Sequence, residues 1–533
     1  MSRGQIIAML ALTLSMASAA WTQSETQQQP APAPPPADQE NATLSVRENP
    51  PISAIDLPGL EPHAAPESFL LMGLHFSESA DSNVSNSLGG SSIGSVTRGL
   101  GSLTLQRLWK NYDVAMDYIG GVAYYHTQGV GTQQLQEFDI DNRINWKRGQ
   151  LAIRDALSYL PEGTFGFGAY GGGGAYNIGL GGLGAGMLGA GAFGGQTNAF
   201  TGGAGGIEPG VVPRLNNVGL ADVVESLTPK SAVTVAAGYA LVHFYGALTS
   251  AITGQSANIN FIGSREFTGQ FGYDFLLSAK DQLAVSYGYQ AFDFSTVGTA
   301  FHSSVIQGMY GHRVSGRMDF LISAGPQFTH ISANETECTI SFQGVQIPIP
   351  VPPGQCTAAG EMLQTTTIQG NHIGAAGRML LRYRFEKTSV SLSFQRWNTN
   401  GSGIFAGAES NVASLQMSRR LGRVWNIFSD LGYAKNKHLQ LPGATIGASS
   451  FSSGFGGAGL HRQFGRSLIA FASYQFNELG FSNDICPTGS ALADGNCINA
   501  AGAALAGKPI SNLSQRQVGT IGVDWTPRPR RLD

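Results

Sequence analysis

Two groups of charged residues at short, even spacings are the part of this sequence that could act on a solute. Spacings of two and four residues place side chains on one face of an extended strand. Acidic and basic walls that face each other across water create a transverse field, which orients polar solutes. The candidates are Asp113, Asp117, Glu137, Asp139, Asp141, Arg143, Arg378, Arg382 and Arg384.

A second interpretation of the same charges needs no partner across a lumen. Each group could be neutralised by charges on adjacent strands and serve only to keep the interior hydrated. Arg143, for example, lies two residues from Asp141 and could neutralise it. Ion selectivity after charge reversal at Arg382 would distinguish these interpretations.

The segments that carry these charges alternate in polarity. From Glu137 to Lys147 the odd positions are polar or charged and the even positions are mostly apolar. A period of two indicates an extended strand with one wet and one dry face. The pattern recurs in segments 283–290, 318–329 and 390–395. A soluble sandwich would bury the dry face, whereas a membrane barrel would turn it towards lipid.

Short turns and long connections alternate along the chain. Eight short turns each contain a basic residue, and nine long connections, one of them over residues 331–363, join the other ends of the strands. This alternation predicts an all-β fold, a single transmembrane antiparallel β-barrel of about 18 strands (range about 16–20), with short periplasmic turns and long outer loops. We expect the barrel over residues 67–527, including the weakly alternating segments 217–227 and 455–464. The basic turn residues are Lys110, Lys147, Lys230, Lys280, Arg317, Lys387, Arg423 and Arg466.

Both ends of the chain have distinct compositions. Residues 1–20 have a positive start, an apolar stretch and small residues at 17–19, which predicts a signal peptide. Residues 21–66 are rich in proline and predict a disordered periplasmic tail. Residues 528–533 form a C-terminal tail. After the leader no apolar run is long enough for a transmembrane helix.

Composition and aromatic positions favour a membrane barrel over a soluble sandwich. Charged residues make up 13% of the chain, against about 25% in soluble domains. Aromatic residues mark expected strand ends, as in interfacial belts. A net charge of −3 is too small to indicate a nucleic-acid partner. The expected partners are outer-membrane lipid, the barrel-assembly machinery and small polar solutes, and the oligomeric state is left open. The aromatic positions are Trp109, Tyr112, Trp146, Trp397, Trp425 and Trp525.

The segment 163–206 contains 20 glycines in 44 residues, with apolar residues between them. It falls in the third long loop. The loop could fold into the lumen and narrow it, or it could be a mobile surface loop, which we favour. Deleting residues 171–195 would raise conductance only in the first case.

Four cysteines predict two local disulfides, Cys338 with Cys356 and Cys486 with Cys497, because an exported chain meets an oxidising compartment. A four-cysteine metal site is the alternative, but it lacks the tight spacings of such sites. We therefore expect no metal and no cofactor.

Motifs for catalysis are weak, and we expect no enzyme and no catalytic residues. Segment 90–94 matches a nucleophile elbow, but in a loop without strand-to-helix context. Segment 502–508 approaches a phosphate-binding loop, yet Pro509 replaces the required Ser or Thr. A hydrolase at the rim would need a histidine beside Ser or Asp, for which His330 or His372 is available.

The unit from Ala221 to Phe244, an in-going strand, a short turn and an out-going strand, resembles the repeat of outer-membrane porin-like barrels of Gram-negative bacteria. Residues 49–53 and 101–124 resemble them too. The generic similarity covers about residues 69–525. It implies a barrel and passive transport, or sometimes exopolysaccharide export, and assigns no solute. Such barrels usually end on an aromatic residue, but here residues 526–533 follow Trp525. Recognition by the assembly machinery is then internal, or the last residues stay free.

These observations predict a porin-like channel for passive diffusion of small polar solutes in the outer membrane of a Gram-negative bacterium. The alternatives are a non-conducting barrel, acting as a surface scaffold or adhesin or in exopolysaccharide export, and a hydrolase at the barrel rim. Conductance in planar bilayers separates the first two, and a lipid or peptide hydrolysis assay tests the third.

Overall fold

The computed structural model describes most of the chain after residue 67, in segments that together contain 24 β-strands. The described residues are 68–84, 93–126, 131–160, 213–245, 247–252, 255–260, 262–295, 297–342, 345–349, 361–399, 406–439, 450–465, 467–481, 490–493, 496–499 and 513–532.

The main sheet is closed. It contains 20 strands, of which β14 and β24 stand outside the ring and the other eighteen form it. Every neighbouring pair in the ring is antiparallel, and β1 pairs with both β2 and β23, which closes the barrel. The ring strands are β1 (Phe69–Asp81), β2 (Gly94–Leu108), β3 (Tyr112–Tyr125), β4 (Gly131–Asn145), β5 (Gly149–Leu160), β6 (Arg214–Thr228), β7 (Ser231–Phe244), β10 (Ser264–Leu276), β11 (Asp281–Phe294), β12 (Thr299–Ser315), β13 (Met318–Phe342), β15 (Glu361–Arg384), β16 (Thr388–Thr399), β17 (Ala408–Leu421), β18 (Trp425–His438), β19 (Ser450–Phe464), β20 (Leu468–Phe481) and β23 (Leu513–Trp525).

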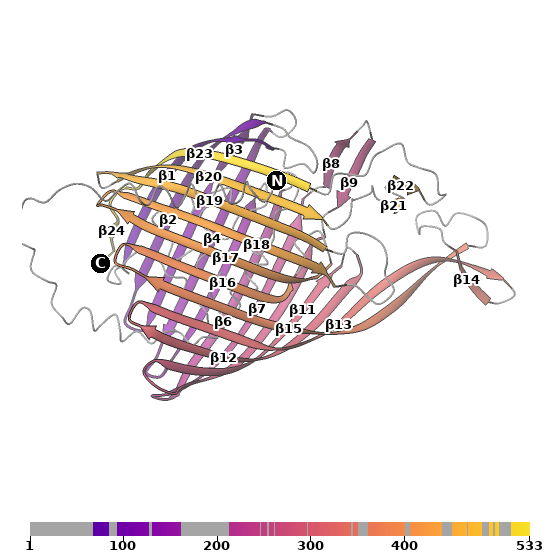
Figure 1. The fold of residues 1–533 in the computed structure, drawn as a ribbon, viewed down its shortest axis with the longest axis horizontal. Helices are drawn as coiled ribbons and strands as arrows, with labels where there is room; N and C mark the ends of the chain where they lie inside the picture. The colour runs from indigo at the N-terminus through magenta and orange to yellow at the C-terminus, as the bar shows by residue number, and fades with distance from the viewer. Residues whose placement is uncertain are drawn as a thin grey trace, which may run out of the picture. The chain divides into compact units, whose positions relative to one another are not determined.

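The strands run obliquely around the ring, and the indigo strands at one wall cross the orange strands at the other in Figure 1. This tilt is what closure of a sheet into a barrel requires. The first and last ring strands lie side by side, so the seam of the barrel joins β1 to β23. The prediction of a single antiparallel barrel of about 18 strands is confirmed, including the weakly alternating strands β6 and β19.

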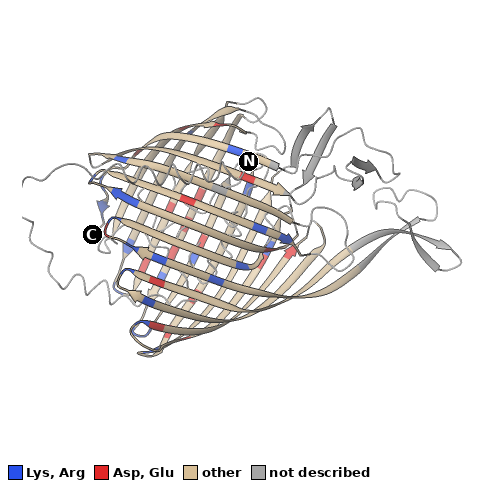
Figure 2. Cartoon of the chain, in the orientation of Figure 1, with Lys and Arg blue, Asp and Glu red and all other residues tan. Residues whose placement is uncertain are grey.

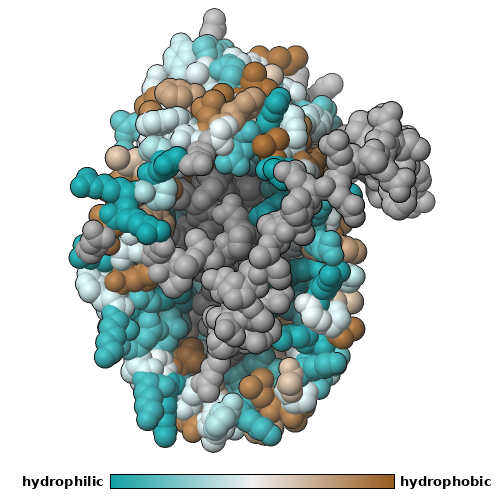
Figure 3. All heavy atoms as spheres, turned by 90° about the vertical axis from the view of Figure 1, so that its left-hand side faces the viewer, coloured by the Kyte–Doolittle hydropathy of each residue, from teal (hydrophilic) through white to brown (hydrophobic). Residues whose placement is uncertain are grey.

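Each of the eight predicted short turns joins two ring strands. Gly422 and Gly465 have φ of 74° and 65° in two of these turns, a left-handed conformation that glycine adopts without strain. In Figure 3, which looks at the short-turn end, hydrophilic side chains are prominent around the rim. The prediction of short turns with basic residues at one end of the barrel is therefore confirmed.

Four short strands lie in the long connections, and two others extend ring pairings. The hairpin β8 (Ala247–Ile252) with β9 (Gln255–Asn260) follows β7, and β21 (Ser490–Ala493) with β22 (Asn496–Asn499) follows β20. The strand β14 (Val345–Ile349) pairs with β13, and β24 (Arg530–Arg531) pairs with the start of β1. Among the residues after Trp525, Arg530 and Arg531 therefore do not stay free.

One predicted loop is largely strand. We expected a long connection over residues 331–363, but β13 and β15 are 25 and 24 residues long and remain paired as far as Ile340 and Glu361. Because about 9–11 residues of a tilted strand span a bilayer, this ribbon continues well past the membrane. Hydrogen bonding between its own two strands sustains it there.

The two faces of the wall differ as a membrane barrel requires. On β1, Met72, Leu74 and Phe76 are 45–61% exposed, whereas the alternate residues His75 and Ser77 are buried. Charged residues are sparse along the strands (Figure 2). The outward face is thus apolar and the inward face polar, which is the reverse of a soluble sandwich.

One expected aromatic belt residue is placed differently. Trp109, Trp146 and Trp525 are each more than 40% exposed at the short-turn ends of their strands, as predicted. Trp397 is only 8% exposed and packs with Val412 and Ala434. It occupies an inward position of β16, so its assignment to a belt at the membrane interface was wrong.

Candidate functional site: the lumen wall

The acidic residues of β3 and β4 meet by cross-strand register. Asp117 lies opposite Asp139, and Glu137 lies one inward position further along. Thr104 on β2 donates a hydrogen bond of 2.6 Å to Asp117. Within the described residues, no cation pairs with these three carboxylates, and the Oδ1 atom of Asp139 has no hydrogen-bond partner. They form an uncompensated acidic patch, which we call the acidic wall.

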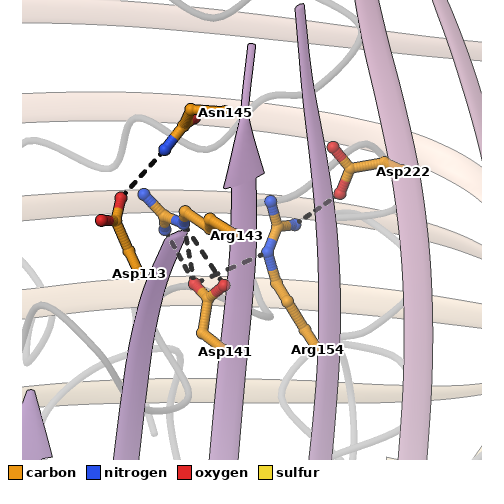
Figure 4. A network of polar contacts seen from close by, with 6 residues as sticks. All are labelled: Asp113, Asp141, Arg143, Asn145, Arg154 and Asp222. Atoms are coloured by element: carbon orange, nitrogen blue, oxygen red, sulfur yellow. Dashed lines mark hydrogen bonds and ion pairs between the residues drawn. The ribbon is translucent and has the colours of Figure 1, made fainter. Parts of the chain in front are cut away.

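Two carboxylates nearer the short turns, Asp141 and Asp222, are compensated by arginines (Figure 4). Arg143 donates a 2.8 Å hydrogen bond to Asp141, as the interpretation of local neutralisation predicted. Arg154 on β5 lies between Asp141 on β4 and Asp222 on β6. Its Nε is 3.8 Å from Asp141 Oδ2, and its Nη1 is 3.1 Å from Asp222 Oδ1.

Asp113, the other acid at this end, has a neutral partner. It accepts a hydrogen bond of 3.0 Å from Asn145 (Figure 4).

Arg154 and Asp222 were missed by sequence reasoning. Both are at least 95% buried, and both occupy inward positions whose alternation is visible in the sequence. Extending the alternation from β4 to β5 and β6 would have found them. Their pairing, by contrast, required the register.

The arginines of β15, like the carboxylates of β3 and β4, include one with a described counter-ion and others without one. Arg382 donates through Nε to Asp319 on β13 over 2.9 Å, because the two residues are register partners. Arg378 faces Ser323 and Gln395 instead, and its Nε has no hydrogen-bond partner in the described part of the chain. Among the described residues, neither Arg378 nor Arg384 forms an ion pair. These two residues are the basic wall.

The two walls lie on nearly opposite sides of the ring. Counted along the eighteen strands, β4 is fourth and β15 is twelfth, so eight steps of pairing separate them. Glu137 and Arg378 lie at similar distances from the short-turn ends of their strands. No described contact joins the acidic wall to the basic wall. The candidates therefore form two separate sites rather than one cluster.

An apolar cluster lies on the inner side near the opposite end of the barrel, and sequence reasoning missed it. Phe292 and Phe294 of β11 stack with Phe301 of β12, with ring centroids 4.4 and 5.9 Å from that of Phe301. Leu439, which follows β18, belongs to the same buried cluster. Two neighbouring strands and the segment after β18 thus contribute to one apolar cluster.

Several predictions fall outside the described residues or stay untested. The glycine-rich segment 163–206, the signal peptide and the proline-rich tail lie outside them. So do Cys356 and Cys486, and both predicted disulfides stay predictions. Among described residues, no group of His, Cys, Asp and Glu could hold a metal ion. In the described part of the chain, no helix has the length and apolar character to cross a membrane.

Searches with the sequence match neither a protein family nor a curated protein. Solved structures with a similar fold include the ferric-catecholate import receptor Fiu from E. coli K12 in its open form, at 10% identity and a TM-score of 0.39, covering 85% of this chain and 81% of Fiu. Pseudomonas aeruginosa OccK2 matches at 8% identity and a TM-score of 0.36, covering 86% of this chain and 97% of OccK2. The siderophore receptor PiuA from Acinetobacter baumannii matches at 10% identity and 0.39, covering 87% and 82%. Values this low do not bear on the solute.

The closed ring and the polarity of its two faces determine which class of protein this chain belongs to. An open or two-sided sheet would leave unpaired edges, whereas this ring has none between β1 and β23. Its outward apolar side chains need lipid, and its inward polar side chains need water. This chain is an outer-membrane β-barrel protein.

Proposed function

We propose that the barrel is a porin-like channel for passive diffusion of small polar solutes. One observation carries the proposal, namely uncompensated charges of opposite sign on nearly opposite walls of a polar lumen. Asp117, Glu137 and Asp139 on one side and Arg378 and Arg384 on the other generate a field across the passage. A solute with separated positive and negative groups aligns in such a field and enters in one orientation.

The apolar cluster adds a size filter. Phe292, Phe294 and Phe301 are at most 2% exposed, so they reduce the cross-section available to water and solutes. Apolar constrictions disfavour hydrated ions and large polar molecules. The two elements together support small polar solutes rather than large ones.

Single-channel recording of the purified barrel in planar bilayers tests this function. We expect discrete conductance steps, and a reversal potential in a salt gradient that shifts towards anion selectivity when the acidic wall is neutralised. A folded barrel that inserts but gives no steps would contradict the proposal. Unchanged selectivity after neutralisation would contradict the field.

A second function is favoured by the ribbon of β13 and β15. Strands of 25 and 24 residues carry this pairing far past the membrane, as a surface scaffold or adhesin would require. Shortening the ribbon by residues 336–365 separates the two functions. A channel keeps its conductance after this deletion, whereas an adhesin loses binding to surfaces.

A further inference from the structure

The seam between the first and last ring strands contains a serine, a histidine and an aspartate in hydrogen-bonding sequence. His75 and Asp524 are register partners across the seam, 449 residues apart in the chain, and His75 Nδ1 is hydrogen-bonded to Asp524 Oδ1. The other ring nitrogen, Nε2, lies 3.1 Å from Ser77 Oγ. All three are inward residues that are at most 8% exposed.

The arrangement determines which nitrogen is basic. Since a carboxylate only accepts hydrogen bonds, His75 Nδ1 carries a proton and donates a hydrogen bond to Asp524. Nε2 is then the acceptor, and the Ser77 hydroxyl donates to it. A histidine held in this tautomer beside a hydroxyl is the arrangement that activates a nucleophilic serine.

Neighbouring residues hold the imidazole in place. The ring of Phe471 stacks on that of His75, with centroids 5.5 Å apart and planes 18° apart. The second oxygen of Asp524 has no hydrogen-bond partner among the described side chains. Among the described side chains, His75 is therefore the hydrogen-bond partner of the Asp524 carboxylate.

A positive charge is placed beside the hydroxyl. Arg98 on β2 is the register partner of Ser77, and both are inward residues. Its Nη1 donates a 2.8 Å hydrogen bond to Ser79, one inward position further along β1. A guanidinium that is 5% exposed is held close to where negative charge would develop on an attacked carbonyl.

We propose that Ser77, His75 and Asp524 form a serine hydrolase site in the lumen wall, with small water-soluble carboxylic esters as substrates. Ser77 Oγ bonds to the carbonyl carbon while His75 Nε2 takes the hydroxyl proton. Arg98 stabilises the oxyanion. The bond to the leaving alcohol breaks, and the imidazolium protonates the alkoxide. Water then attacks the acyl-serine, and His75 transfers the proton of the water to Ser77 as the acid departs.

Burial and surroundings select the substrate class. Ser77 is 7% exposed, so only a compact molecule reaches it. The adjacent inward side chains Ser79 and Thr520 are hydroxyls in contact with each other over 2.9 Å. A small polar ester fits this lining, whereas a long acyl chain does not.

Covalent labelling of the folded wild-type barrel in detergent is the direct test. The probe is a small alkyl fluorophosphonate, and peptide mass spectrometry locates the adduct. We expect one adduct, on Ser77. Ser303 is an internal control, because it is also a buried, inward serine but has Thr329 and Gln327, and no histidine, as its described hydrogen-bond partners. A folded barrel that stays unlabelled at Ser77, or that is labelled equally at Ser303, overturns the proposal.

Variants show whether His75 and Asp524 activate the Ser77 hydroxyl or only stabilise the seam. His75→Gln should lower the labelling rate by about 100-fold or more, and Asp524→Asn by a similar factor, since both remove base catalysis. The matched variant Ser303→Ala should label like the wild type. Hydrolysis of p-nitrophenyl acetate should disappear in Ser77→Ala. Should His75→Gln fold, as shown by its heat-dependent gel mobility, and label at the wild-type rate, the site is structural only.

Discussion

The acidic residues of β3 and β4 and the arginines of β15 show the same pattern with opposite signs of charge. In both, some charges pair with a counter-ion on the same or an adjacent strand, and others have none among the described residues. Asp141 faces Arg154, and Arg382 faces Asp319. Asp139 faces Asp117 and Ala156, neither of them a cation. Alternation therefore places a charge in the lumen, and the ion pairs that its neighbours form decide whether its field survives.

The largest effect is expected where one buried cation compensates two carboxylates. Replacing Arg154, which is 2% exposed, by methionine leaves Asp141 and Asp222 close together without their shared cation. Removing one partner of a buried ion pair costs about 3–5 kcal/mol. We expect this loss in the free energy of unfolding, measured by urea titration of the barrel in lipid vesicles. Adding Asp222→Asn should recover part of it. A variant as stable as the wild type would show that the pairs contribute nothing.

The second largest effect is expected at the contact between β12 and β13. This contact holds β13 in place, and β13 carries Asp319, the partner of Arg382. A Cβ at Gly325 would lie 1.7 Å from the carbonyl oxygen of Ile306, a backbone atom that cannot rotate away. Gly325→Ala should lower the free energy of unfolding by about 1–3 kcal/mol. The matched variant Gly269→Ala meets nothing within 4 Å and should have little effect. Equal stabilities of the two variants would refute this packing.

Selectivity distinguishes compensated from uncompensated charge directly. Neutralising the acidic wall as Asp117→Asn, Glu137→Gln and Asp139→Asn should lower the cation-to-anion permeability ratio about 5-fold, from about 1 kcal/mol of lost Coulomb energy. Asp141→Asn should change it less, since Arg143 and Arg154 already neutralise that carboxylate. Reversal potentials in a salt gradient measure both. An equal shift in the two variants would refute the distinction.

The smallest effect is expected at an exposed ion pair between two of the short turns. Arg317 and Glu386 are 3.5 Å apart, with side chains 59% and 79% exposed. Solvent screens such a pair, so Arg317→Gln should change the free energy of unfolding by less than about 1 kcal/mol. Urea titration alongside Arg154→Met provides the comparison. A loss as large as in Arg154→Met would contradict the role given to burial.

Some of the lumen was predictable from local sequence. The period of two placed Asp139 and Arg378 on inward faces, because a strand turns successive side chains to opposite sides. The basic turns at Lys110 and Lys280 marked strand ends correctly. Trp397 was misassigned to the membrane interface, since a position near a strand end does not specify the face.

The alternation of the chain by itself determined strands with one apolar and one polar face, because successive side chains of a strand point to opposite sides. The alternating short and long connections and the low content of charged residues then favoured a membrane barrel over a soluble sandwich. Only the tertiary structure decided which inward residues meet. His75 and Asp524 become neighbours because the ring closes, and Phe301 joins one buried cluster with Leu439, which follows β18. Such pairings depend on register and closure, which arise from hydrogen bonding along the whole ring and not from any local pattern.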